Sequence, residues 1–275
     1  MPNLTRPNTG ELVRRLIRQL LEYGYSPMMD ERYTGQFDGV EYGKFESLLI
    51  DCDLVAAVGG DGTILHCAKH ALVYDKPVIG VNTGRLGYLA QIEADELQLF
   101  SRLRTGNYLL QKRMVLEVTL EGETQPYYAL NDAVISKGAL GRLVDLDLIG
   151  NGQPMGSYRA DGIIFATPTG STAYSLSAGG PIVDPSIGTI LLTPICPHSL
   201  NDRSILFSPD MRLQVRSRFI NNSDAVLLSI DGECIATLDK QRTVSIQRSK
   251  KQALFISFAE KGFHMILGSK LESRG

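Results

Sequence analysis

The chain of 275 residues lacks the features that mark membrane-spanning, secreted or strongly charged proteins. No apolar run is long enough to cross a bilayer, and the opening MPNLTRPNTGELVRR has no apolar stretch of the kind a signal peptide requires. Lysine and arginine number 28 against 30 aspartates and glutamates. This near balance gives no electrostatic argument for binding nucleic acid or an anionic membrane surface. We therefore expect a cytoplasmic protein without nucleic-acid or membrane partners.

Spacings typical of metal sites are also missing. The sequence has no C-x-x-C pair, and its isolated cysteines favour small buried thiols in a reducing compartment. His66 and His70 lie one helical turn apart, but no third ligand stands near them. The sequence therefore predicts no metal held by protein side chains alone. The four cysteines are Cys52, Cys67, Cys196 and Cys234.

The pattern of apolar residues divides the chain into two parts. Asp53–Val58 and Pro77–Asn82 are short continuous apolar runs, as in parallel strands covered on both faces, and helical periodicity appears over 11–23, after 63 and over 93–106. From about Gln111 onward, short apolar runs separated by turn residues indicate a β-rich domain, and we expect each run to form a strand. Among these runs are YYALNDAVIS, TVSIQRS and ALFISFAE. We expect an α/β domain with a parallel sheet and crossover helices over 1–108 and a β-sandwich over 109–250. The segment 251–275 could return to the first domain.

The sequence GGDGT, Gly59–Thr63, follows the first of these strands and precedes a helix. Glycines there let backbone N–H groups converge at a helix N-terminus, which suits phosphate; the alternative is a tight turn and nothing more. It is no P-loop, because Gly-Lys-Ser/Thr does not follow, and Asp61 interrupts any dinucleotide fingerprint. A carboxylate repels phosphate unless a metal or a proton intervenes. Asp61 therefore suits a general base or a magnesium partner.

Polar residues also interrupt the β-rich part. The stretch Ala160–Val183 is dense in hydroxyls and glycines, which favours a ligand-lining loop over a serine/threonine-rich loop with local caps. Tyr174 within it could stack on a planar base or be an ordinary core aromatic. Asn131 and Asp132 interrupt an apolar run, so they either grip a vicinal diol such as a ribose or form a bulge or turn.

Two isolated cations complete the candidates. Arg142 and Arg159 could meet phosphates, although a solvated surface arginine is the more common case.

Five motifs follow one another along the chain: GGDGT, VNTGRLGYLA at Val81–Ala90, Asn131–Asp132, Asp161–Ile182 and PICPHSL at 194–200. Together, in this order, they resemble the NAD kinase family. The match runs over about Asp53–Ser208 and thins toward both ends. GGDGT alone is weak evidence for the family, because lipid kinases and phosphofructokinase-like enzymes carry similar turns. The stretch TPTGSTAYSLSAGG is specific to the family.

The resemblance implies a reaction and an architecture. The reaction is transfer of the ATP γ-phosphoryl group to the 2′-hydroxyl of the adenosine ribose of NAD, giving NADP and ADP. Mg²⁺ or another divalent cation would be held by the ATP phosphates. The architecture is an N-terminal α/β domain and a C-terminal β-sandwich, assembled as a homodimer or homotetramer.

The resemblance also implies residue roles. Asp61 is the base, Asn131 and Asp132 hold the adenosine ribose, and Thr172–Ser177 lines the adenine. Asp161 reaches the nicotinamide end of a dinucleotide held mainly by a neighbouring subunit. The expected NAD-binding residues are Asp61, Gly62, Asn131, Asp132, Arg142, Arg159, Asp161, Thr172, Ala173, Tyr174, Ser175 and Ser177. The expected ATP-phosphate residues are Gly59, Gly60, Gly62, Thr63 and His66.

Some positions depart from the family pattern. Bacterial relatives often have arginine where His66 stands and glutamine where Glu233 stands. We regard Asp231 and Glu233 as weaker candidates for ligand contact than the residues named above. Similar proteins usually open with an apolar strand, whereas MPNLTRPNTGEL starts at the turn. We expect such a strand to lie upstream of Met1. Two other functions compete: a lipid kinase of the diacylglycerol or sphingosine type, and a non-catalytic NAD-sensing module.

Overall fold

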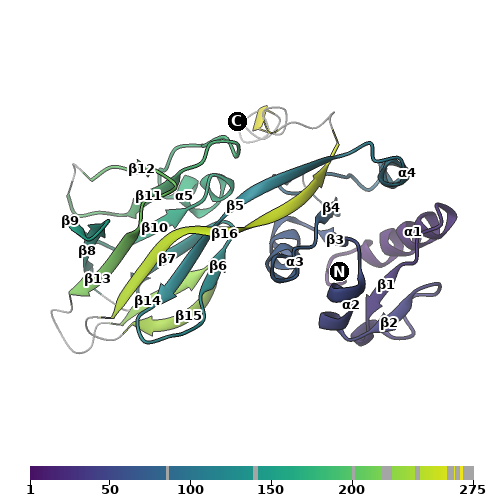
Figure 1. Ribbon diagram of the computed structural model, residues 1–275, viewed down its shortest axis with the longest axis horizontal. Helices are drawn as coiled ribbons and strands as arrows, with labels where there is room; N and C mark the ends of the chain where they lie inside the picture. The colour runs from purple at the N-terminus through teal and green to yellow at the C-terminus, as the bar shows by residue number, and fades with distance from the viewer. Residues whose placement is uncertain are drawn as a thin grey trace. The chain divides into compact units, whose positions relative to one another are not determined.

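The computed structural model describes residues 1–84, 87–138, 142–199, 202–218, 225–238, 242–258, 263 and 267–268. The chain divides into two compact units (Figure 1). Met1–Lys112 and Ala253–Gly275 form the first unit, and Arg113–Gln252 forms the second. The long strand β16 (Thr243–Ser257) therefore begins in the second unit and ends in the first.

A parallel sheet lies at the centre of the first unit. β3 (Val55–Gly59) pairs in parallel with β4 (Val78–Asn82), and the end of β16 pairs in parallel with β4. Both apolar runs that predicted parallel strands are confirmed, with bounds that differ by one or two residues. Both strands are buried almost throughout, which explains their continuous apolar sequence.

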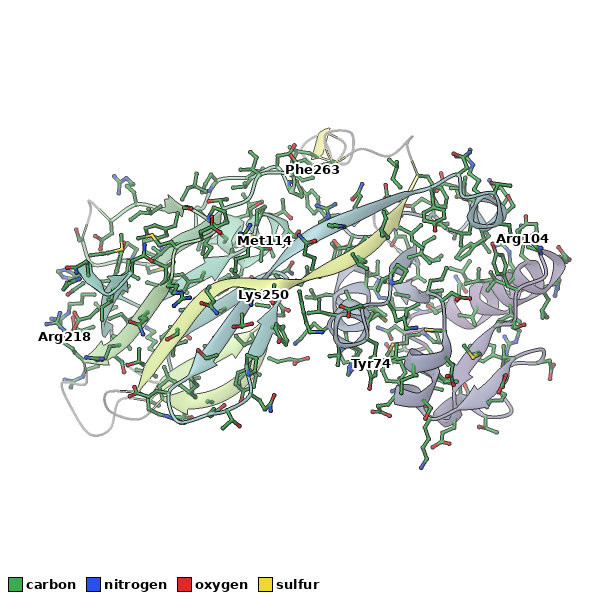
Figure 2. All side chains as sticks on the ribbon, in the orientation of Figure 1. Tyr74, Arg104, Met114, Arg218, Lys250 and Phe263 are labelled. Carbon is green, nitrogen blue, oxygen red and sulfur yellow. The ribbon has the colours of Figure 1, made fainter. Side chains whose placement is uncertain are left out.

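Two long helices pack in this unit. α1 (Thr9–Glu22) buries Leu12, Val13, Leu16 and Ile17, which recur at helical spacing and form one apolar face. α3 (Asp61–Val73) follows β3 directly. The shorter elements are β1 (Met28–Asp30), η1 (Glu31–Tyr33), β2 (Glu41–Gly43), α2 (Phe45–Asp51), η2 (Leu97–Phe100) and α4 (Ser101–Arg104). Arg104, labelled in Figure 2, donates a hydrogen bond to the Tyr23 carbonyl beyond the end of α1.

The helix expected over 93–106 is present only as the short turns η2 and α4. Ile92 forms a parallel bridge with Val81, so the backbone is still extended there. The Glu93 N–H is then capped by the Glu96 carboxylate at 2.8 Å. The Glu96 N–H also donates to the Glu93 carbonyl at 3.0 Å, so a separate turn over 93–96 precedes η2, which begins at Leu97.

The first residues of the chain pair with β3. The Asn3 N–H donates to the Val58 carbonyl and the Val58 N–H to the Met1 carbonyl, each at 2.9 Å. The Met1 ammonium donates to the Ala56 carbonyl at 2.6 Å, and burial lowers its pKa. Residues 1–3 thus run in parallel beside β3, with a bridge between Pro2 and Val58.

The second unit is a β-sandwich of two largely antiparallel sheets. One sheet has the order β12-β11-β10-β7-β14-β15, and the other contains β6, β5, β16, β13, β8 and β9. The first sheet's bounds are β12 Ile205–Phe207, β11 Ile190–Ile195, β10 Gly162–Ala166, β7 Asp132–Lys137, β14 Val226–Ile230 and β15 Glu233–Leu238. The second sheet's are β5 Leu109–Leu120, β6 Tyr127–Ala129, β13 Leu213–Arg218, β8 Val144–Gly150 and β9 Gln153–Ala160.

Side chains from both sheets form the sandwich core. Ile163 and Phe165 of β10 lie in this core with residues of β5 and β8, and Met114, labelled on β5 in Figure 2, packs against it. Ile164 and Ala166 belong to a second cluster with Val183 from the loop after β10. The apolar sequence of β10 is therefore continuous because both of its faces are covered.

The strand pattern differs from the sequence prediction at two places. The run YYALNDAVIS, expected as one strand, is divided into β6 and β7, which belong to different sheets. TVSIQRS and the first five residues of ALFISFAE, expected in two separate strands, both lie in the single strand β16, which ends at Ser257. Among the described residues, no helix is long and apolar enough to span a bilayer.

Candidate functional site

The turn Gly59–Thr63 joins the end of β3 to the first turn of α3. Gly60 is the extended N-cap residue, with φ −94° and ψ −177°, and its carbonyl accepts the Thr63 N–H at 2.9 Å. A Cβ at Gly59 would overlap the Thr63 side chain, whereas a Cβ at Gly62 would meet nothing within 4 Å. Close packing therefore requires glycine at Gly59, while Gly62 borders open space. The first N–H groups of a helix have no partner within the helix and can bind an anion.

The Asp61 carboxylate is held by the backbone of the VNTGRLGYLA segment. It accepts the N–H groups of Tyr88 at 2.8 Å and Leu89 at 3.2 Å. A Cβ at Gly87 would overlap this carboxylate, so only glycine permits the approach. The two N–H groups fix the orientation of the side chain. Asp61 is partly buried, beside the exposed Gly62.

His66 faces a different environment from the turn. Its exposed ring contacts the ring of His70 at a centroid distance of 4.7 Å. Both histidines line a cavity of about 410 Å³ that includes none of the residues Gly59–Thr63. Its other lining residues are Met1, Asp30, Glu31, Arg32, Lys44, Phe45 and Glu46. The assignment of His66 to ATP phosphate stays a prediction, and this position gives it no support.

Asp231 clamps the segment in front of β7 in the second unit. Its carboxylate accepts the backbone N–H groups of Leu130 at 3.0 Å, Asn131 at 2.8 Å and Asp132 at 3.0 Å. The Asp231 N–H returns a bond to the Asp132 carbonyl at 2.9 Å. Asp231 and Gly232 both have positive φ, 49° and 82°, as a two-residue hairpin turn between β14 and β15 requires. The sequence analysis missed this clamp.

The loop after β10 packs on the same segment. The Thr167 N–H donates to the Asn131 carbonyl at 2.9 Å, and the Thr167 hydroxyl donates to the Leu130 carbonyl at 2.5 Å. The same hydroxyl accepts the Gly170 N–H at 3.0 Å. A Cβ at Gly170 would overlap the Asn131 carbonyl. Asn131 and Asp132 are thus fixed from two sides.

Asp132 is the most deeply buried of the candidate acids, with 4% of its surface exposed. Desolvation, and secondarily the charge of Asp231, raises its pKa from 3.8 to about 7. Near neutral pH a substantial fraction of this carboxyl therefore carries a proton, so it can donate as well as accept a hydrogen bond.

Several hydroxyls of the loop over 167–183 are satisfied within the protein. The Ser171 hydroxyl donates to the Pro168 carbonyl at 2.7 Å and accepts the Val183 N–H at 3.0 Å. The buried Ser175 hydroxyl pairs with the hydroxyl of Thr193 at 2.8 Å. The loop forms the short helices η3 (Thr169–Thr172) and α5 (Tyr174–Ser177). Part of the hydroxyl density therefore has a local structural explanation.

Other candidates of the second unit lie at its surface. Tyr174 is 45% exposed, which excludes the alternative of a core aromatic. The Asp161 carboxylate forms an ion pair with Lys137 at 2.7 Å. Thr172 and Ala173 are partly buried. The exposed candidates are Arg142, Arg159, Ser177 and Glu233.

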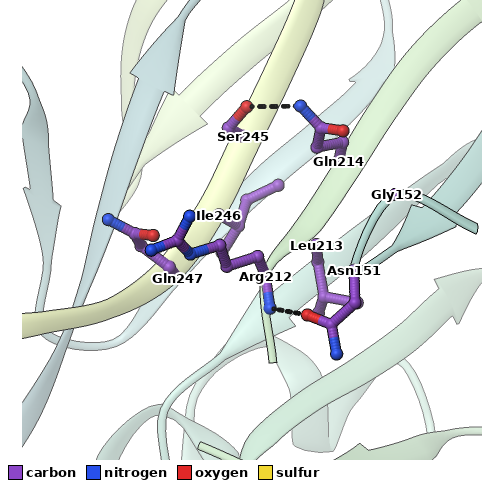
Figure 3. A pocket seen from close by; sticks show the side chains of 8 residues that line it. All are labelled: Asn151, Gly152, Arg212, Leu213, Gln214, Ser245, Ile246 and Gln247. Atoms are coloured by element: carbon purple, nitrogen blue, oxygen red, sulfur yellow. Dashed lines mark hydrogen bonds between the residues drawn. The ribbon is translucent and has the colours of Figure 1, made fainter. Parts of the chain in front are cut away.

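A cavity of about 620 Å³ in the second unit is separate from all of these candidates (Figure 3). Its lining residues come from the β8–β9 turn and from strands β13 and β16. The Arg212 N–H donates to Asn151 at 3.0 Å, and Gln214 donates to Ser245 at 3.3 Å. The lining residues are Asn151, Gly152, Arg212, Leu213, Gln214, Ser245, Ile246 and Gln247.

Family models match both parts of the chain. The model of the ATP-NAD kinase N-terminal domain matches residues 3–106, and that of the ATP-NAD kinase C-terminal domain matches residues 130–258. The chain belongs to the NAD kinase family. The NAD kinase of Desulforamulus reducens is 38% identical over 98% of this chain and 95% of its own length. The NAD kinase of Thermoanaerobacter sp. strain X514 is 36% identical over 100% of this chain and 98% of its own length.

Solved structures of the NAD kinase family agree. Yeast NADH kinase complexed with NADH has a TM-score of 0.87 at 28% identity, over 97% of this chain and 84% of that one. The NAD kinase from Archaeoglobus fulgidus in complex with ATP has a TM-score of 0.73 at 25% identity, over 95% of each chain. The family resemblance and the two-domain fold class deduced from the sequence are confirmed.

Proposed function

We propose that this protein transfers the γ-phosphoryl group of ATP to the 2′-hydroxyl of the adenosine ribose of NAD, forming NADP and ADP. The observation that carries the proposal is that family membership extends over both parts of the chain while the GGDGT carboxylate, Asp61, is held by backbone N–H groups at the start of α3. A lipid kinase would share the GGDGT turn and a β-rich second domain, but the matches to both NAD kinase domain models disfavour it.

The first unit would carry the transfer. Phosphoryl transfer demands little covalent chemistry from the protein, only an aligned nucleophile and neutralised charge. The N-terminus of α3 offers partial positive charge to phosphate. Because the Thr63 N–H is already bonded to the Gly60 carbonyl, the preceding amides would bind the anion. Asp61 would accept the proton of the 2′-hydroxyl, since two N–H groups already orient its carboxylate.

The second unit would hold NAD. Asn131 and Asp132 would bind the two ribose hydroxyls, and the mixed protonation of Asp132 suits a diol that both donates and accepts. The exposed ring of Tyr174 would stack on adenine. Arg142 and Arg159 would meet the NAD phosphates.

A divalent cation would accompany the donor. Within the described residues, no cluster of three or more His, Cys, Asp or Glu side chains could hold a metal ion. The phosphate oxygens of ATP would therefore be the ligands of the cation, which leaves the Asp61 carboxylate available as the base. When bound, Mg²⁺ would neutralise charge on the transferring phosphoryl group.

The direct test is a coupled assay of NAD plus ATP and Mg²⁺, read by an NADP-specific dehydrogenase. We expect NADP formation that depends on all three components. Parallel reactions with NADH, polyphosphate and diacylglycerol would define the acceptor and the donor. A thermal shift with NAD but no NADP would instead favour the sensing module, and phosphorylated lipid would favour the lipid kinase.

We further propose that the enzyme is a homodimer or homotetramer and that Asp161 serves a dinucleotide held by a neighbouring subunit. This carboxylate already pairs with Lys137 of its own chain, so its orientation is set before assembly. Mixed oligomers of Asp161→Ala and Asp61→Asn chains should regain activity, because one site then escapes both lesions. Activity that never exceeds the sum of the parents would place both residues in one subunit's site.

A further inference from the structure

The turn Gly59–Thr63 leaves most of the donor's charge without a side-chain partner. It has no lysine of the P-loop type, and Asp61 adds a negative charge beside the position proposed for phosphate. The partial charge of a helix N-terminus is about half an elementary unit, far below that of a triphosphate. A full cation held at this turn would add to the neutralisation that Mg²⁺ and the helix N-terminus supply.

Arg6 lies against the backbone of this turn. A Cβ added at Gly60 would lie 2.7 Å from Nη2 and 2.9 Å from Nη1 of Arg6. A Cβ at Gly84, in the loop after β4, would lie 3.0 Å from the same Nη1. The guanidinium therefore occupies the space that side chains at Gly60 and Gly84 would fill. The ends of β3 and β4 meet beneath it, since these strands are neighbours in the sheet.

The segment that carries Arg6 is anchored at both ends. Asn3 bonds to Val58 of β3 through its backbone N–H, and its side-chain amide donates to the Thr63 hydroxyl at 3.4 Å. On the other side, the Thr9 N–H donates to the Arg6 carbonyl at 3.4 Å, just where α1 begins. The position of Arg6 over the turn is thus a consequence of the fold and not of a free N-terminal arm.

The Arg6 side chain has no competing partner in the part of the chain that the structure describes. It is exposed, and it makes no ion pair or side-chain hydrogen bond there. The same short turn holds a second unused polar group: the Thr9 hydroxyl, fully buried, has no hydrogen-bond partner among the described residues. A cation placed beside glycine backbone, without a carboxylate of its own, is available for an anionic ligand.

We propose that Arg6 binds the phosphate groups of the nucleoside triphosphate donor at the Gly59–Thr63 turn and supplies the positive charge that a P-loop lysine supplies elsewhere. This inference rests on the proposed function for the identity of the donor. A guanidinium suits the role because its planar N–H groups bind two phosphate oxygens at once.

The experiment uses the full-length protein and three variants: Arg6→Gln, Arg6→Lys and, as the matched control, Arg18→Gln. Arg18 is an exposed arginine of α1. Binding of MgATP is measured by calorimetry without NAD, and steady-state kinetics give the KM of ATP and of NAD separately. The binding arm does not depend on turnover, so it tests Arg6 even if the proposed reaction is wrong.

We expect Arg6→Gln to weaken MgATP binding and raise the KM of ATP by about 10- to 100-fold, the usual size of a lost charge-assisted contact. The KM of NAD should stay within about twofold of the wild-type value. Arg6→Lys should lose less MgATP affinity than Arg6→Gln, and Arg18→Gln should bind MgATP as the wild type does.

Unchanged MgATP binding in Arg6→Gln, or equal rises in both KM values, would overturn the inference. If Arg6→Gln is unstable, Arg6→Met replaces it, and unchanged MgATP binding in that variant would overturn the inference in the same way. NADP formation with unchanged ATP affinity in the variants would refute the role of Arg6 alone. Arg6-dependent MgATP binding without NADP formation would refute only the proposed function.

Discussion

Each of the two units contains a carboxylate that accepts successive backbone N–H groups, but the proposed role of that carboxylate differs between them. In the first, the Asp61 carboxylate accepts two successive backbone N–H groups, and Gly87 packs against it. In the second, the Asp231 carboxylate accepts three successive N–H groups. A glycine, Gly170, again allows the close approach, here to the clamped backbone itself.

The two units differ in whether the hydrogen-bonded carboxylate is itself the proposed functional group or only supports neighbouring residues. In the first unit the anchored carboxylate is itself the proposed reactive group, beside the open space at Gly62. In the second unit the Asp231 carboxylate holds the backbone of residues 130–132, and its negative charge helps to raise the pKa of the neighbouring Asp132. Bonds from N–H groups can therefore either orient a reactive carboxylate or turn a carboxylate into a support. Substitutions on each side of this comparison should separate the two uses.

The largest effect is expected for Asp61→Asn. Loss of a general base typically lowers turnover by about 10²- to 10⁴-fold, whereas the KM of NAD should change little. Steady-state kinetics of NADP formation provide the measurement. The control is Asp38→Asn, an exposed aspartate of the same unit. Near-normal turnover would show that Asp61, like Asp231, is only a support.

Gly170→Ala should destabilise the clamped segment of the second unit. The added Cβ would overlap the Asn131 carbonyl, and overpacking typically costs about 1–3 kcal/mol. Urea unfolding measures the change, and the KM of NAD should rise because Asn131 is displaced. In the control, Gly188→Ala, the new Cβ would be 3.5 Å from Pro209, an ordinary contact. Equal unfolding midpoints for the two variants would contradict the packing argument.

Asp132 should make stability depend on pH. Its folded-state pKa of about 7 lies above 3.8, so between these values the folded protein binds more protons than the unfolded chain. Its contribution is fully present below the unfolded pKa and is lost as the pH rises through about 7. Between pH 5 and pH 8 the loss should be about 2–3 kcal/mol.

Thermal midpoints at several pH values test this linkage. Asp132→Asn should remove most of the decline between pH 5 and pH 8, because the amide does not titrate. Asp145→Asn, on β8 of the same sandwich, should keep the wild-type decline. A variant Asp132→Asn with an undiminished decline would assign the pH dependence to another group.

The smallest effect is expected for Lys137→Gln. The Lys137–Asp161 pair is about one-third exposed on each side, and such pairs contribute roughly 0–1 kcal/mol because water screens them. The free energies of unfolding of Lys137→Gln and Lys250→Gln, measured in urea, should therefore differ by no more than this amount. Lys250→Gln is the control, because Lys250 is an exposed residue of β16. A loss comparable to that of Gly170→Ala would mean that the ion pair, too, holds the site together.

Much of the fold could be predicted because it depends on local pattern. The continuous apolar runs of β3 and β4 identified buried parallel strands, and the periodicity over 11–23 identified α1. The glycines of GGDGT marked the turn into α3. Burial face and backbone preference are properties of neighbouring residues, so they can be read from a short window of sequence.

The family, the fold class and the polar residues at strand ends could all be recognised from the amino-acid sequence. The hydrogen-bond partners of those residues could not, because they depend on the tertiary structure. Asp231 reaches Asn131 across 100 positions of the chain, and Arg6 reaches the turn at Gly60 only because residues 1–3 pair with β3. Likewise, the hydroxyl of Ser175 is satisfied by Thr193 of β11, so a residue expected at a ligand proves to be buried. Hydrogen bonds between distant segments depend on how strands are ordered in the sheets, and no local pattern specifies that order.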